Sequence, residues 1–144
     1  MAEAILNRKG PPAFAAYSAG SHPAGIVHRY ALREIESAGL STKGLRSKSW
    51  EEFAKPGAPK MDFVFTVCDK AAAEVCPIWP GQPMTAHWGI ADPAAVVGRP
   101  DEISRAFRDA FVVLDRRIGL LLALPLASLE RLALERELRR IGRE

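Results

Sequence analysis

Long hydrophobic runs are missing from this 144-residue sequence. The longest apolar stretch, 118–127, contains Gly119 and Pro125, and it is too short to cross a bilayer. We interpret it as the interior of a buried helix. The first ten residues also lack the apolar segment of a secretory signal. The sequence therefore predicts no membrane partner, and we expect the protein in the cytoplasm.

Cysteine is scarce, because the chain has only Cys68 and Cys76. Thiols stay reduced in the cytoplasm, so two cysteines there are either reactive or inert and do not form a permanent disulfide. Their spacing fits neither a zinc site nor a thioredoxin-like Cys-x-x-Cys motif. We expect no metal and no cofactor.

Blocks of a single charge are also absent. The 20 Lys and Arg residues nearly balance 17 Asp and Glu residues, which gives a net charge of +3. No basic block is interleaved with aromatic residues, so we expect no nucleic-acid partner, although the small positive charge suits an anionic ligand. With 48% hydrophobic and 26% charged residues, the composition is that of one globular domain with a real core.

The hydrophobic pattern predicts strands that alternate with helices. We expect helices over 1–9, 24–38, 101–124 and 128–141, and strands over 14–18, 63–67 and 84–88, with loops and a short fragment between 41 and 60. The run at 63–67 is continuously apolar, as in a strand covered on both faces. In the last helix, Leu129, Leu132, Leu138 and Ile141 form the expected core face. This order indicates an α/β fold with a mostly parallel sheet.

Cys68 comes directly after the strongest predicted strand. Ligands bind at the carboxyl ends of parallel strands, so Cys68 is expected to face a site. Seven residues separate it from Cys76, enough for the sulfurs to meet if a helical turn between them unwinds. The alternative is a buried strand-end side chain at Cys68 and an inert loop thiol at Cys76.

Asp92 precedes Pro93, after a string that begins at His87. Proline keeps its preceding residue extended, so the carboxyl group of Asp92 can be aimed into a cleft as a proton donor. The alternative is that Asp92 only caps a nearby helix. His87 is interpreted as a structural histidine.

Seven strings, taken together and in this order, resemble arsenate reductases of the low-molecular-weight protein tyrosine phosphatase family, the type recycled by cellular thiols. The strings are Met1-Ala2-Glu3-Ala4, Ser18-Ala19-Gly20, Phe65-Thr66-Val67-Cys68-Asp69, Cys76-Pro77, Trp79-Pro80-Gly81, His87-Trp88-Gly89 and Asp92-Pro93. The resemblance covers nearly all of residues 1–125. It implies the family's three-layer α/β fold for residues 1–125, with 126–144 as a C-terminal helical extension.

The resemblance also implies site residues and partners. Asp92 matches the general acid of the family, and Cys68 and Cys76 match thiols that carry oxidation away from the nucleophile. The implied substrate is arsenate or a phosphate-like oxyanion, the implied partner is thioredoxin or another thiol donor, and the implied role is arsenical resistance. The alternatives are a low-molecular-weight tyrosine phosphatase and a non-catalytic remnant or regulatory domain.

One departure from the family is large. Its members open with a strand and a phosphate-binding Cys-x5-Arg loop, which supplies the nucleophile. Here the sixth residue after Cys68 is Glu74, and the sixth after Cys76 is Gln82. We therefore expect the first strand and the loop to be missing from these residues and the chain to be inactive as it stands. Met1 is then an internal methionine of a longer product, or the chain is a truncated homologue.

Overall fold

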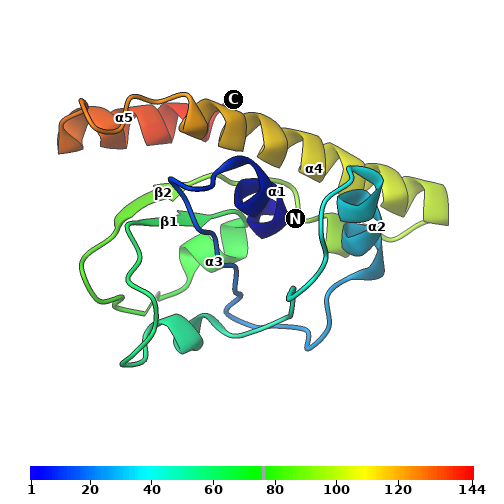
Figure 1. Cartoon of the computed structure of the whole chain (residues 1–144). Helices are drawn as coiled ribbons and strands as arrows, with labels where there is room; N and C mark the ends of the chain where they lie inside the picture. Colours follow the sequence, from blue (N-terminus) through cyan, green and yellow to red (C-terminus); the bar gives the residue numbers. More distant parts are fainter. Residues whose placement is uncertain (76) are drawn as a thin grey trace.

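The computed structural model describes residues 1–75 and 77–144, so the predictions for Cys76 lie outside the described residues. In chain order its elements are α1 (Ala2–Lys9), α2 (Arg29–Ser37), the 3-10 helix η1 (Trp50–Phe53), β1 (Phe63–Thr66), α3 (Asp69–Ala73), β2 (Met84–His87), the 3-10 helix η2 (Pro93–Ala95), α4 (Pro100–Leu122) and α5 (Arg131–Ile141) (Figure 1). The four long helices and the two later strands predicted from the sequence are all present.

β1 and β2 form a two-stranded parallel sheet, with Phe63 beside Met84 and Thr66 beside His87. The parallel pairing confirms the predicted α/β class. The four residues of β1 are all half-buried, so both faces of the strand are covered in part and neither is covered fully, as the sequence led us to expect of a strand within a sheet. Within the described residues, β1 pairs with β2 alone.

The side chains of β2 alternate between the two faces of the sheet. Met84 and Ala86 are buried, whereas Thr85 and His87 are exposed. Trp88, the next residue, returns to the core with 2% of its surface exposed. His87 therefore lies on the face opposite to the core, which is the period of two expected for a strand.

The main core lies where β2 meets α1, α4 and α5. Figure 1 shows α4 and α5 running along one side of the sheet, with α1 beside the strands. The buried residues of this cluster are Ile5, Met84, Ala86, Trp88, Leu114, Ile118, Leu121, Leu134, Leu138 and Ile141. Ile118 and Leu121 are buried in α4, but the helix ends at Leu122, so the prediction of a buried helix interior holds for the first half of the longest apolar stretch and is wrong for residues 123–127. No described helix combines the length and the apolar character that crossing a membrane requires.

α5 packs its apolar face onto β2 and α4. Leu138 and Ile141 are fully buried, as predicted, but Leu132 is 73% exposed, and its place in the core is taken by Leu134. The helix begins at Arg131, not at residue 128, so the buried face follows the spacing 134, 138 and 141. The indole Nε1 of Trp88 donates a hydrogen bond to the carbonyl of Leu138 at 2.9 Å, which joins α5 to the end of β2.

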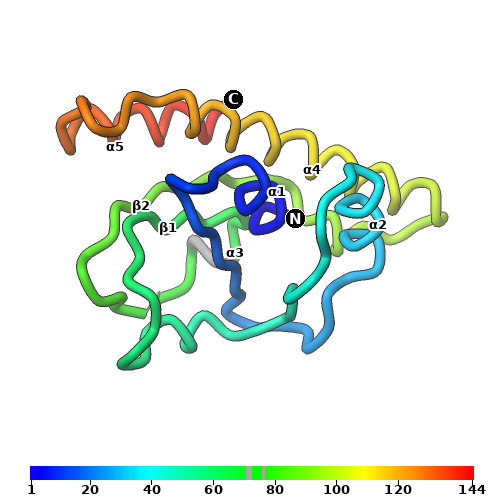
Figure 2. Tube along the Cα trace, viewed as in Figure 1, coloured from blue at the N-terminus to red at the C-terminus, as the bar shows by residue number. Residues whose placement is uncertain are grey.

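The predicted strand over 14–18 is absent. In its place, the side-chain amide of Asn7 holds the backbone of Ala16, donating to its carbonyl at 3.0 Å and accepting from its N–H at 2.8 Å. Further on, Gly20 forms an isolated bridge with Ser49. Figure 2 traces the segment from the end of α1 to the start of α2, in which residues 14–18 belong to no strand.

α2 begins five residues later than predicted, at Arg29 instead of residue 24. Gly25 has a φ of +90°, a left-handed conformation that cannot continue a helix, and its N–H donates to Ser47. His28 caps the helix by accepting a hydrogen bond from the N–H of Tyr30. Gly39 ends it with a φ of +72°, which confirms the predicted glycine stop.

Candidate site at the carboxyl ends of the strands

The chain segments that leave β1 and β2 stay side by side after the strands end. Trp88 N–H donates to the carbonyl of Thr66 at 2.7 Å, and Ile90 N–H donates to that of Val67 at 2.9 Å. Cys68 follows Val67 directly, and Asp92 stands two residues after Ile90. The two segments that carry these predicted site residues therefore lie side by side beyond the carboxyl ends of the strands, which is where parallel sheets bind ligands.

Asp92 has the extended backbone that Pro93 imposes, with φ −71° and ψ 109°. Its side chain is exposed, and its Oδ1 accepts a hydrogen bond from Ala94 N–H at 2.9 Å at the start of η2. The helix-cap reading of Asp92 is thus observed. Because this bond uses one carboxylate oxygen, the geometry leaves the second oxygen for other chemistry.

Arg117 of α4 fixes the segment between β2 and Asp92. Its Nη1 donates to the carbonyls of Trp88 at 2.7 Å and of Gly89 at 3.2 Å. The side chain is only 6% exposed, and this burial lowers the pKa of its guanidinium. Its Nε is buried without a hydrogen-bond partner among the described residues. The sequence analysis missed this residue, although position 117 falls on the apolar stripe of α4, between Leu114 and Leu121.

Cys68 lies half-buried between the end of β1 and the first turn of α3. Cys76 is outside the described residues, so the geometry of the predicted thiol pair is not part of the structure. α3 supplies the helical turn that was expected between the two cysteines. Its first residue, Asp69, is highly exposed.

Thr66 and Asp69 stand on either side of Cys68 in the sequence, and His87 contacts both of them. His87 Nδ1 lies 2.8 Å from Thr66 Oγ1, and His87 Nε2 lies 2.9 Å from Asp69 Oδ1. We call Thr66, His87 and Asp69 the His87 cluster. Sequence reasoning did not connect them, because the pairing register that places Thr66 beside His87 is set by the sheet.

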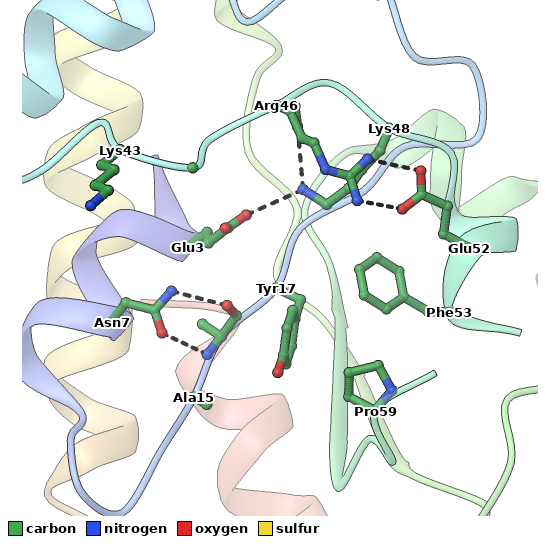
Figure 3. A pocket seen from close by; sticks show the side chains of 12 residues that line it. Glu3, Asn7, Ala15, Tyr17, Lys43, Arg46, Lys48, Glu52, Phe53 and Pro59 are labelled. Carbon is green, nitrogen blue, oxygen red and sulfur yellow. Dashed lines mark hydrogen bonds and ion pairs between the residues drawn. The ribbon is translucent and has the colours of Figure 1, made fainter. Parts of the chain in front are cut away.

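A separate hollow of about 570 Å³ opens near α1 (Figure 3). Four of the charged side chains that line it form two ion pairs with one another. Arg46 binds Glu52 through two hydrogen bonds of 2.9 and 2.6 Å, which lowers the pKa of the Glu52 carboxyl and raises that of the Arg46 guanidinium. Lys48 is buried, with its Nζ 3.7 Å from Glu3 Oε2.

The carboxylate of Glu3 also accepts a hydrogen bond from the Ser18 hydroxyl, so α1, the segment after it and the loop before η1 are joined at this point. Cys68 and Asp92 are not among the residues that line the hollow. It is therefore distinct from the carboxyl ends of the strands. In the part of the chain that the structure describes, no group of three His, Cys, Asp or Glu side chains is placed to hold a metal ion.

Comparisons with known proteins extend over most of the chain. Residues 1–136 match the family described as low molecular weight phosphotyrosine protein phosphatase. The chain is also 31% identical over 102 residues to an arsenate reductase from Halalkalibacterium halodurans, and the match covers 71% of this chain and 70% of that protein. These matches show that the chain belongs to the low-molecular-weight phosphotyrosine protein phosphatase family.

Proposed function

We propose that the chain serves arsenate reduction, with Asp92 as general acid and with Cys68 and Cys76 as the thiols that resolve the reaction. The observation that carries the proposal is the pair of backbone hydrogen bonds from Trp88 and Ile90 to Thr66 and Val67. These bonds hold the segments that lead to Cys68 and Asp92 side by side, beyond the carboxyl ends of the strands. The similarity to an arsenate reductase supports the choice of substrate.

The proposed reaction starts with the thiolate of a Cys-x5-Arg loop, which residues 1–144 do not contain. That sulfur bonds to arsenic and displaces one oxygen, which takes a proton from Asp92 and leaves as water. A second thiolate, from Cys68, then attacks the first sulfur. The sulfur–arsenic bond breaks, its electron pair stays on arsenic, and As(V) becomes As(III) while a disulfide forms.

Cys76 passes the oxidation on to the electron donor. Its thiolate exchanges with the new disulfide, so that the oxidised pair becomes Cys68 and Cys76 and the nucleophile is released. Thioredoxin or another dithiol donor then reduces this pair and is itself oxidised. Each cycle consumes two electrons from the donor, which matches the change of two in the oxidation state of arsenic.

The family description favours a second candidate, hydrolysis of phosphate esters. A phosphatase uses the same nucleophile and general acid but transfers the phosphoryl group to water, so it needs no thiol relay. Loss of Cys68 therefore separates the two activities, because only the reductase depends on it.

The test joins residues 1–144 to a preceding strand and Cys-x5-Arg loop and compares this protein with residues 1–144 alone. With thioredoxin, its reductase and NADPH, we expect arsenite only from the extended protein. Cys68→Ser in that protein should abolish turnover of arsenate and leave hydrolysis of p-nitrophenyl phosphate unchanged.

Three results would each contradict a part of the proposal. Arsenite from residues 1–144 alone would remove the need for the loop. Undiminished arsenate turnover in Cys68→Ser would remove the relay. Ester hydrolysis without arsenate reduction would leave the phosphatase as the function.

A further inference from the structure

The His87 cluster links three chain segments around one cysteine. Thr66 ends β1, His87 ends β2, and Asp69 starts α3. The residues bound by His87 are the one two positions before Cys68 and the one directly after it. None of the three has a part in the proposed reaction.

The protonation pattern of the cluster follows from its acceptors. An ionised Asp69 carboxylate can only accept, so His87 Nε2 carries the hydrogen and donates to it. In the neutral imidazole, Nδ1 is then an acceptor and takes the hydrogen of the Thr66 hydroxyl. A single tautomer of His87 satisfies both contacts.

Gly89 leaves the space that the His87–Asp69 contact needs. A Cβ atom at position 89 would lie 2.6 Å from His87 Nε2 and 2.9 Å from Asp69 Oδ1, too close for either to stay in place. Trp88, between His87 and Gly89, is buried on the opposite side. In the string His87-Trp88-Gly89, Trp88 is therefore buried in the core, and the missing side chain of Gly89 leaves space for the contact between His87 and Asp69.

We propose that His87 is a positioning residue for Cys68, holding the turn from β1 into α3 through Thr66 and Asp69. The proposal rests on the proposed relay role of Cys68. The contact is exposed, since 42% of the His87 side chain and 90% of that of Asp69 face solvent. Such a contact is weak, so it restrains the turn without preventing α3 from unwinding when Cys68 meets Cys76.

The test measures how fast iodoacetamide alkylates Cys68 in the reduced 144-residue chain, with peptide mass spectrometry separating Cys68 from Cys76. His87→Ala should raise the rate at Cys68 by about two- to five-fold, the range expected for loss of one weak, solvent-exposed contact to a carboxylate. His87→Gln keeps a donor for Asp69 and should give a smaller increase. Thr85→Ala, on the same face of β2, is the matched control and should change nothing.

Gly89→Ala tests the same contact without altering its members, because the new methyl group displaces the end of the His87 side chain. It should raise the rate at Cys68 as His87→Ala does, and the double variant should react no faster than either single variant. An unchanged rate at Cys68, an equal increase at Cys76 or in Thr85→Ala, or additive effects in the double variant would each overturn the proposal.

Failure here is distinguishable from failure of the proposed function. Alkylation requires neither arsenate nor the Cys-x5-Arg loop, so it reports only on the turn that carries Cys68. Arsenate turnover by the extended protein reports on the reaction itself.

Discussion

Asp92 carries two carboxylate oxygens, and the bond from Ala94 N–H engages Oδ1. In the protein extended by a Cys-x5-Arg loop, we expect Asp92→Asn to lower arsenate turnover on the order of 10²–10⁴-fold, as for loss of a general acid. Asparagine caps helices about as well as aspartate, so the free energy of unfolding should be nearly unchanged.

Steady-state kinetics and urea unfolding of the Asp92→Asn protein check the two halves of this prediction. Asp92→Ala is the companion variant, because it loses both the proton donor and the cap. Turnover of the Asn variant within a few-fold of the parent would leave Asp92 as a helix cap alone.

Arg117 acts at the same scale, through the carbonyls of Trp88 and Gly89. Arg117→Met removes the donor and leaves two inward-facing carbonyl groups without it, which should lower the free energy of unfolding by about 1–3 kcal/mol. Arg105→Met, at an exposed position of the same helix, is the control. Equal urea midpoints for the two variants would show that the Arg117 bonds contribute nothing measurable.

At the scale of single elements, α3 separates the two cysteines by one short helix. Disulfide geometry requires the two Cα atoms to lie within about 7 Å, and we expect α3 to unwind when Cys68 and Cys76 pair. We expect mild oxidation of the 144-residue chain to give this intramolecular disulfide, and mass spectrometry of a non-reduced digest detects it. Only free thiols or intermolecular dimers in that digest would contradict a relay.

Helices and strands that are specified by a hydrophobic pattern within their own residues could be predicted from the sequence. The helix predicted over 101–124 is α4, and the strand predicted over 84–88 is β2, because a repeating apolar pattern specifies each of them. Phe14 to Ser18 also has a strand-like pattern, but a strand needs a neighbouring strand, and here Asn7 binds the backbone instead.

The candidate site shows the same division. The sequence placed Cys68 after a strand and Asp92 before a proline, since both relations are local. His87 contacts Asp69, 18 positions away, because of the register of the sheet. Arg117 donates to the carbonyl of Trp88, 29 positions away, because of how α4 packs. Such distant contacts leave little trace in a single sequence.

At the scale of the whole molecule, α5 shares one core with β2 and α4. Leu138→Ala should therefore lower the free energy of unfolding of the entire chain by about 2–5 kcal/mol, as for a large side chain lost from a packed core. Leu132→Ala is the matched control on the exposed side of α5 and should stay within about 0.5 kcal/mol of the parent.

Urea unfolding followed by fluorescence and by circular dichroism checks this prediction. If α5 and the rest of the chain form one cooperative unit, both probes should report a single transition that moves together in Leu138→Ala. Two separate transitions, or a shift confined to one probe, would mean that α5 unfolds on its own.

The two hydrogen bonds between Asn7 and Ala16 make the chain after α1 sensitive to deamidation of Asn7. The Asn7 amide serves Ala16 as a neighbouring peptide group would, offering one donor and one acceptor. Hydrolysis to aspartate during storage would replace the donor with a charged oxygen that faces the Ala16 carbonyl and repels it. Aged preparations would then contain a second population of molecules with the same starting sequence, in which the side chain at position 7 no longer holds the backbone of Ala16.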